Sequence, residues 1–180
     1  MKKFIAGFRI FLILLLTIIM TSFQIIFLLF CKGNASYILP RLWHKAICAI
    51  IGLKVEVRGT PVHDQQLVYI GNHISYLDIP AVGSVLKASF IGKDDIARWP
   101  VIGQLAKAQQ TAFISRNARN AKKVANALDV MLAKGKSLIL FPEGTSSTGE
   151  SVLPFKSSLF SIAQPKDLPP ISIQPFIIEL

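Results

Sequence analysis

An uninterrupted apolar segment near the start of the chain constrains its fold more than any other feature. From Ile10 to Phe30 the sequence runs for 21 residues without a charged side chain. As a helix rising 1.5 Å per residue, such a segment is long enough for a hydrocarbon core of about 30 Å. A cleaved secretory signal usually has a shorter apolar region and a small-residue cleavage site, which Leu28 to Lys32 does not offer. We therefore expect a membrane anchor.

Positive charge surrounds this apolar segment. Residues 1–55 hold seven Lys and Arg and no acid, whereas the rest of the chain holds thirteen bases and ten acids. Cations beside a membrane segment attract anionic headgroups. The later sequence has no basic stripe interleaved with aromatic residues, as nucleic-acid binding would favour. The charge pattern therefore predicts a membrane partner and no nucleic acid.

The same charges do not orient the anchor. Three basic residues precede it and three follow nearby, so the positive-inside rule gives a tie. A helix pair that dips into one leaflet, with both ends on the cytosolic side, would give the same tie. A second apolar pattern over residues 38–53 fits either an interfacial helix or a helix packed on the domain core. The way in which the anchor enters the membrane and the role of residues 38–53 therefore stay open at this point.

Only two cysteines, Cys31 and Cys48, are present. Two cysteines near an apolar segment form neither a disulfide framework nor a metal cluster. We therefore expect a catalytic domain that faces the reducing cytoplasm from the cell (inner) membrane.

Short apolar runs alternate with helical patterns after residue 53. The expected strands are Lys54–Arg58, Gln66–Ile70, Gln110–Ile114 and Ser137–Phe141, and the expected helices are Asp78–Leu86 and Asn117–Lys134. This alternation predicts an α/β domain with a mostly parallel sheet flanked by helices. The predicted organisation is an anchor over residues 1–53 and a domain over 54–180. Because the chain ends inside an apolar run, we expect the domain to be short or C-terminally incomplete.

The most informative motif is the segment from Gly71 to Asp78, Gly-Asn-His-Ile-Ser-Tyr-Leu-Asp, which follows an expected strand and opens an expected helix. The carboxyl ends of strands are where α/β sheets bind their ligands. With His73 in the loop and Asp78 in the first helical turn, the carboxylate would accept one imidazole N–H and leave the other nitrogen as a general base. A substrate hydroxyl would then replace a Ser or Cys nucleophile. The structural alternative, in which Ser75 or Asp78 caps the helix, stays open.

A second polar loop follows the strand that ends at Phe141. Its sequence, Phe-Pro-Glu-Gly-Thr-Ser-Ser, predicts backbone N–H groups near Gly144 that face an anion or an alcohol. A simple Pro/Gly turn is the alternative. A phosphate-binding P-loop is excluded because Glu150 stands where Lys is required. A nucleophile elbow is excluded because no glycine follows Ser146 at the required spacing.

A third motif, Phe113-Ile114-Ser115-Arg116, places an arginine just past an expected strand. A guanidinium at this edge of a sheet would pair with a phosphate or another anionic headgroup. The alternative is a solvated arginine near the start of a helix.

Together these motifs resemble those of the glycerolipid acyltransferase family, which includes PlsC-like 1-acylglycerol-3-phosphate acyltransferases. The family pattern Asn-His-x-Ser-x-x-Asp is matched in full by Asn72, His73, Ser75 and Asp78. Phe-Ile-x-Arg is matched by Phe113, Ile114 and Arg116, and Phe-Pro-Glu-Gly-Thr by the residues from Phe141 to Thr145. A looser block around a proline resembles Ile173-Gln174-Pro175. The blocks occur in the family's order.

The resemblance implies an O-acyltransferase that moves a fatty acyl group from acyl-CoA or acyl-acyl-carrier protein to the free hydroxyl of a lysolipid. By this resemblance, His73 would deprotonate that hydroxyl and Asp78 would orient His73. The positions that the family would use to bind substrate are Asn72, Ser75, Phe113, Arg116, Glu143, Gly144 and Thr145. The resemblance implies no metal and no bound cofactor. The first acceptor to expect is 1-acylglycerol-3-phosphate, which would give phosphatidic acid in phospholipid biosynthesis.

One departure from the family bears on the acceptor. Ser146 stands where many members that use lysophosphatidate have Arg, which weakens the case for a phosphate-bearing acceptor. Relatives that acylate lyso-ornithine lipid look similar over residues 144–147 and 153–160, so lyso-ornithine lipid is the alternative acceptor. Two other functions are a catalytically inactive membrane lipid-binding protein and a thioesterase that uses water. The presence of both His73 and Asp78 argues against the first, and the anchor argues against the second.

Overall fold

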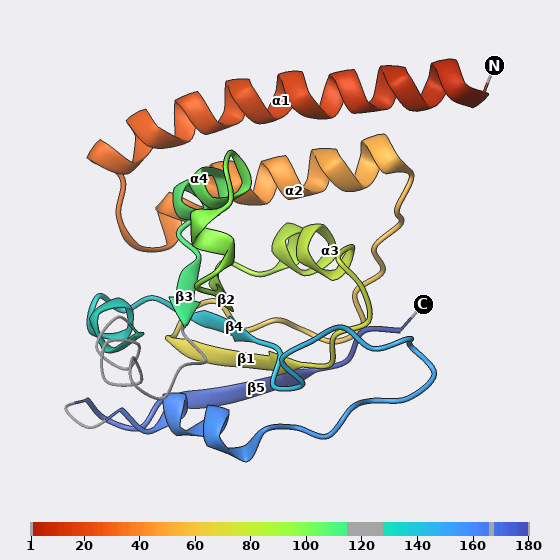
Figure 1. Ribbon diagram of the computed structural model, residues 1–180. Coiled ribbons are helices and arrows are strands. Elements are labelled where there is room, and N and C mark those ends of the chain that lie inside the picture. Colours follow the sequence, from red (N-terminus) through yellow and green to blue (C-terminus); the bar gives the residue numbers. More distant parts are fainter. Residues whose placement is uncertain (1, 115–127, 166–167, 180) are drawn as a thin grey trace. The chain divides into compact units, whose positions relative to one another are not determined.

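A computed structural model describes residues 2–114, 128–165 and 168–179 of the 180-residue chain. The chain divides into two compact units (Figure 1). The first comprises Met1–Pro61 and Ile79–Lys87, and the second comprises Val62–Asp78 and Ala88–Leu180. The first unit therefore contains a helical segment from the middle of the chain in addition to the predicted anchor region.

The first unit is built on a pair of helices. Helix α1 (Lys2–Phe30) is followed by a 3-10 turn η1 (Gly33–Tyr37) and by α2 (Ile38–Ile51), which returns alongside α1 (Figure 1). Hydrogen bonds connect α1 to both α2 and η1. Trp43 Nε1 donates to Thr17 Oγ1 at 3.0 Å, and Gln24 Nε2 donates to the Ser36 carbonyl at 3.0 Å. Thr17 and Gln24 are buried, and these hydrogen bonds replace the water that they lose.

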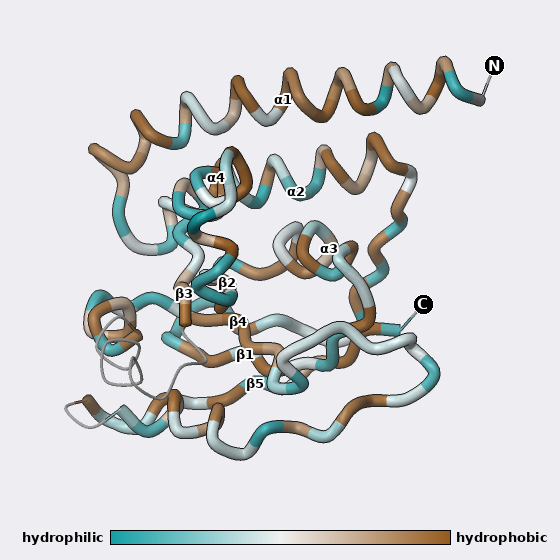
Figure 2. Tube along the Cα trace, viewed as in Figure 1, coloured by the Kyte–Doolittle hydropathy of each residue, from teal (hydrophilic) through white to brown (hydrophobic). Residues whose placement is uncertain are grey.

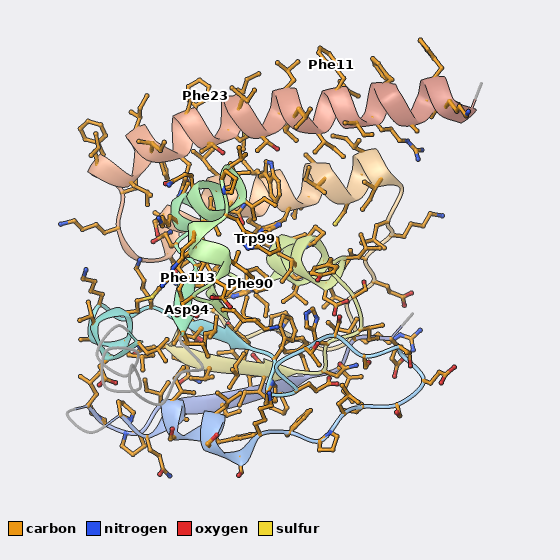
Figure 3. The ribbon with its side chains drawn as sticks, viewed as in Figure 1. Phe11, Phe23, Phe90, Asp94, Trp99 and Phe113 are labelled. Atoms are coloured by element: carbon orange, nitrogen blue, oxygen red, sulfur yellow. The ribbon has the colours of Figure 1, made fainter. Side chains whose placement is uncertain are left out.

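The outer surface of α1 is apolar along most of its length (Figure 2). Phe11 and Phe23 point away from α2 in Figure 3, and each is 59% exposed. By length and composition, α1 is long and apolar enough to cross a membrane. The predicted anchor segment is therefore helical, and its exposed apolar surface is consistent with membrane association.

Helix α2 has one buried face and ends at a glycine. Its buried residues are Pro40, His44, Ile47 and Cys48, which recur at helical spacing. Gly52 has a φ of 82° and ends the helix, while the N–H of Leu53 donates to the Cys48 carbonyl at 2.8 Å. This is the hydrogen bond of a Schellman motif.

Helix α3 (Asp78–Val85) begins in the second unit and continues into the first. Arg41 Nε donates to the Ser84 carbonyl at 2.9 Å, which links α2 to the end of α3. Gly83 lies against the His44 ring so closely that a Cβ there would come within 2.3 Å of a ring carbon. The predicted helix over Asp78–Leu86 is confirmed.

The second unit contains a five-stranded parallel sheet. Its strands are β1 (Leu67–Gly71), β2 (Ser89–Lys93), β3 (Ala112–Ile114), β4 (Leu138–Leu140) and β5 (Ser172–Phe176). Their order across the sheet is β3-β2-β4-β1-β5, and every described pair of neighbours is parallel. The predicted α/β class with a parallel sheet is confirmed.

Alternating side chains of the central strands pack into the core. Val68 and Ile70 of β1 join Leu140 of β4 in one buried cluster, which the 3-10 segment η4 (Ser157–Ala163) covers. A second cluster contains Ala112, Leu132 and Leu138. Since β1 is buried along its whole length, it reads as a continuous apolar run rather than an alternating one.

Shorter helical segments complete the second unit. They are η2 (Ile96–Arg98), α4 (Ile102–Ala108) and residues 128–133. The last of these belongs to the predicted helix over Asn117–Lys134, whose first part lies outside the described residues. Gly135 follows it with a φ of 72°, as expected for a residue that ends a helix.

Val62 fixes the chain where it enters the second unit. Its carbonyl accepts the Tyr69 hydroxyl, and its N–H donates to Gln174 Oε1 at 3.0 Å. Burial, with a smaller contribution from the charge of Asp64, raises the pKa of Tyr69, so its hydroxyl remains a donor at neutral pH.

One predicted strand is wrong. Residues 54–58 form no strand, although apolar and charged side chains alternate there. Val55 and Val57 are 39% and 47% exposed, so the apolar half of the pattern is not buried against a sheet. Alternation predicts a strand only when a neighbour covers its apolar face.

Replacing Gly71 with Ala should destabilise the second unit. A Cβ at Gly71 would lie 2.3 Å from Phe176 Cε2, so the β5 ring would have to move. We expect a loss of about 1–3 kcal/mol in the free energy of unfolding, measured by urea titration in detergent. Gly92→Ala is the matched strand control, because its Cβ would meet the Thr111 methyl at 3.2 Å and the Phe113 ring at the ordinary contact distance of 3.7 Å. Equal losses for the two variants would contradict this prediction.

Candidate active site

The loop between β1 and α3 brings His73 and Asp78 together. His73 Nδ1 lies 2.7 Å from Asp78 Oδ2, and the side chains are 15% and 2% exposed. Because β1 ends at Gly71 and α3 begins at Asp78, the whole motif occupies the carboxyl edge of the sheet. This is where α/β sheets place their ligands.

The same carboxylate oxygen accepts two backbone N–H groups. Asp78 Oδ2 lies 2.7 Å from the Ile74 nitrogen and 3.0 Å from the Ser75 nitrogen. An ionised carboxylate only accepts hydrogen bonds, so the short contact with His73 assigns the proton to Nδ1. In that tautomer Nε2 carries a lone pair and points away from Asp78. The arrangement is that of a general base with an orienting acid.

An aromatic side chain fixes the plane of the imidazole. The ring of Phe141 stacks on His73 with a centroid distance of 4.5 Å and an interplanar angle of 13°. Phe141 in turn contacts Phe90 and Phe176, at 6.3 Å and 6.1 Å between centroids. Sequence reasoning did not include Phe141 among the site residues, although it opens the Phe-Pro-Glu-Gly-Thr block.

The loop after β4 holds the backbone of His73. Glu143, which is 3% exposed, accepts the His73 N–H at 2.7 Å through Oε1. Its second oxygen accepts the Leu153 N–H at 2.9 Å. The Ser147 N–H donates to the His73 carbonyl at 2.8 Å. The two sequence motifs therefore meet at His73, because β1 and β4 are neighbours in the sheet.

Other predicted site residues make local contacts. The Asn72 side chain donates to the Ile178 carbonyl at 3.0 Å and accepts the Ile178 N–H at 2.7 Å. Ser75 Oγ accepts the Leu77 N–H at 3.0 Å, so the hydroxyl stabilises the turn that leads into α3. These contacts shape the loop, and a role of either side chain in substrate binding stays a prediction.

One N–H group in the loop around Gly144 is engaged within the protein, and the binding role predicted for Gly144 and the neighbouring N–H groups stays a prediction. The Gly144 N–H donates to the Phe141 carbonyl at 3.0 Å, so it closes a turn instead of facing an anion. Its φ of 71° lies in the left-handed region that glycine adopts readily. Glycine at this position is therefore explained by the turn.

The remaining predicted residues lie elsewhere or outside the described chain. Thr145 is exposed in the loop after β4. Phe113, labelled in Figure 3, belongs to β3, which β2 and β4 separate from β1. At a strand spacing of about 4.8 Å, β3 lies roughly 14 Å from β1. Arg116 lies outside the described residues.

Metal ligands do not cluster in the part of the chain that the structure describes. Within residues 2–114, 128–165 and 168–179, no group of three or more His, Cys, Asp or Glu side chains has an arrangement that could hold a metal ion.

Comparison with known families places this geometry in context. The family model described as Acyltransferase matches residues 54–179, which include both loops at the carboxyl edge of the sheet. The chain belongs to the acyltransferase family. The resemblance drawn from the sequence motifs is thereby confirmed.

Curated acyltransferases similar to the chain carry two kinds of name. A lyso-ornithine lipid O-acyltransferase of Rhizobium meliloti is 39% identical over 126 residues, covering 69% of this chain and 43% of the relative. A 1-acyl-sn-glycerol-3-phosphate acyltransferase of Neisseria gonorrhoeae is 40% identical over 135 residues, covering 74% of this chain and 52% of the relative. The chain spans about half the length of the curated relatives that it matches.

A solved acyltransferase structure has a similar fold. The crystal structure of the 1-acyl-sn-glycerophosphate (LPA) acyltransferase PlsC from Thermotoga maritima matches with a TM-score of 0.63. The match covers 94% of this chain and 83% of that structure, at 20% sequence identity. At this identity the similarity supports the fold alone.

Replacing Asp78 with Asn should strongly reduce acyl transfer. An amide in place of the carboxylate removes the negative charge that stabilises the imidazolium, and its NH₂ group can donate to Nδ1 and so favour the wrong His73 tautomer. We expect a fall in kcat of about 100- to 10,000-fold, measured as labelled acyl transfer in membranes. Asp95→Asn, at an exposed acid of the same unit, should leave kcat nearly unchanged. If the Asp78→Asn variant is fully active, Asp78 does not orient His73 for catalysis.

Proposed function

We propose that the chain is a membrane-associated O-acyltransferase that moves a fatty acyl group from a thioester to the free hydroxyl of a lysolipid. The observation that carries this proposal is the His73 imidazole, held through Nδ1 by Asp78 with Nε2 directed away from the carboxylate. The family and the apolar surface of α1 support a lipid substrate at the membrane.

The proposed reaction begins with the lysolipid hydroxyl beside Nε2. His73 takes the hydroxyl proton as the oxygen attacks the thioester carbonyl carbon, so a C–O bond forms. The C–S bond then breaks and the thiolate leaves, taking the proton from the imidazolium. Asp78 stabilises the imidazolium while it exists. His73 takes the hydroxyl proton and returns it to the leaving thiolate, so the reaction needs no other proton carrier. We propose no metal and no bound cofactor.

The donor in this proposal is acyl-CoA or acyl-acyl-carrier protein, both of which are thioesters. We further propose that the protein lies in the inner membrane with its catalytic unit in the cytoplasm. The apolar helix α1 and the positive charge beside it support a membrane location, and the free thiols of Cys31 and Cys48 are consistent with a reducing cytoplasm.

The residue at position 146 bears on the choice between lyso-ornithine lipid and 1-acylglycerol-3-phosphate as acceptor. This half-buried hydroxyl carries no charge to pair with a phosphate, and we propose lyso-ornithine lipid as the acceptor. Relatives named lyso-ornithine lipid O-acyltransferase, such as that of Rhizobium meliloti, support this choice. The sequence motifs put 1-acylglycerol-3-phosphate first. It remains the second candidate because the similar Neisseria gonorrhoeae protein is named for it.

An acyl-transfer assay tests the proposed function. Membranes containing the protein would receive either labelled acyl-CoA or labelled acyl-acyl-carrier protein as donor. Lyso-ornithine lipid and 1-acylglycerol-3-phosphate would each be offered as acceptor. We expect a labelled diacyl product that His73→Ala reduces at least about 1,000-fold, because the base is lost. Release of free fatty acid without lipid product would indicate a thioesterase. Specific lipid binding without either product would indicate an inactive lipid-binding protein.

Ser146→Arg tests the acceptor. A guanidinium at this position should raise kcat/KM for lysophosphatidate by about tenfold or more, because a charge-assisted hydrogen bond contributes about 1.5–3 kcal/mol. Thr148→Arg, at an exposed position of the same loop, is the control for added charge alone. If Ser146→Arg leaves kcat/KM for lysophosphatidate unchanged, or if Thr148→Arg changes it equally, Ser146 does not set the acceptor preference.

A further inference from the structure

Glu143 belongs to the motif that the family uses for the acyl acceptor, yet its carboxylate faces the protein interior. The residue is 3% exposed. Oε1 lies 2.7 Å from the His73 nitrogen and Oε2 lies 2.9 Å from the Leu153 nitrogen. Each carboxylate oxygen is therefore engaged by a backbone N–H.

Because Glu143 is buried, its carboxylate would have to turn out of the interior to reach an acceptor, which would break these two hydrogen bonds. Contacts of this length between N–H groups and an ionised carboxylate are among the stronger hydrogen bonds in proteins. Turning either oxygen toward an acceptor would leave a buried N–H without its partner. The observed placement favours an internal role of Glu143.

That internal role concerns the backbone of His73. The peptide N–H of His73 donates to Glu143, and its carbonyl accepts the Ser147 N–H at 2.8 Å. Asp78 and Phe141 fix the ring of His73, whereas Glu143 and Ser147 fix its main chain. The Leu153 contact ties the returning end of that loop to the same carboxylate. The position of the base therefore depends on Glu143 and on the closure of this loop.

We infer that Glu143 is a positioning residue that holds the backbone of His73, and that it is not a ligand of the acyl acceptor. This inference rests on the proposed function, since it assigns Glu143 to the base rather than to the lysolipid. The exposed Thr145 and the half-buried Ser146 in the same loop are then better placed to meet the acceptor.

Glu143→Gln separates the two roles. The amide keeps one acceptor oxygen but turns an NH₂ group toward the other N–H, so one of the two contacts is lost. A displaced base lowers kcat by about 10- to 100-fold, while the acceptor KM stays within about twofold. Glu150→Gln, at an exposed acid of the same loop, should change neither parameter. A raised acceptor KM with kcat preserved would overturn the inference.

A second pair of variants decides the matter if Glu143→Gln does not fold. Leu153→Pro removes the N–H that Oε2 accepts and leaves the carboxylate in place, whereas Leu153→Ala keeps the N–H. The positioning role requires a lower kcat for the proline variant than for the alanine variant, at equal acceptor KM. Equal kcat values for the two variants would overturn it.

Amide hydrogen exchange separates this inference from the proposed function. If the wild-type protein transfers no acyl group, the proposed function fails, and exchange at His73 still tests the hydrogen bond from its N–H. Exchange in the full chain in micelles should be at least about tenfold faster in Glu143→Gln than in Glu150→Gln. Equal exchange rates would overturn the positioning role.

Discussion

Three N–H groups meet at one carboxylate oxygen of Asp78, and the geometry of the site depends on this convergence. The donors are His73 Nδ1 and the main-chain nitrogens of Ile74 and Ser75. A carboxylate that is 2% exposed is stable only when hydrogen bonds replace water, so the loop must fold around it. Since β1 fixes one end of the loop and α3 begins at the other, the same contacts set the position and the tautomer of the base.

The parallel sheet supplies the rest of the site from a distant part of the sequence. Because β4 pairs with β1, the loops that follow them emerge at one edge (Figure 1). Phe141 covers the face of the imidazole and Glu143 accepts the His73 N–H. The loop after β4 therefore contacts both the ring and the main chain of His73, while Asp78 holds the ring from its own loop. Support from two loops is what a preorganised base in the proposed reaction would require.

Local features of this protein could be predicted from its sequence, whereas contacts set by strand order could not. The apolar segment of α1 and the pairing of His73 with Asp78 follow from patterns within a few residues. The inward orientation of Glu143 depends on which strand lies beside β1, and no local pattern specifies that neighbour. The expected strand at residues 54–58 failed for the same reason, since alternation does not reveal whether a neighbour covers it.

The central claim is that Asp78 holds His73 with its proton on Nδ1. The most direct measurement is nitrogen-15 NMR of the histidine-labelled protein in micelles, with His73→Gln to assign one of the three imidazoles. At neutral pH the account predicts a protonated Nδ1, hydrogen-bonded to the carboxylate, and an unprotonated Nε2. An imidazole with its proton on Nε2 would contradict the account, because the nitrogen directed away from Asp78 would then have no lone pair with which to act as a base.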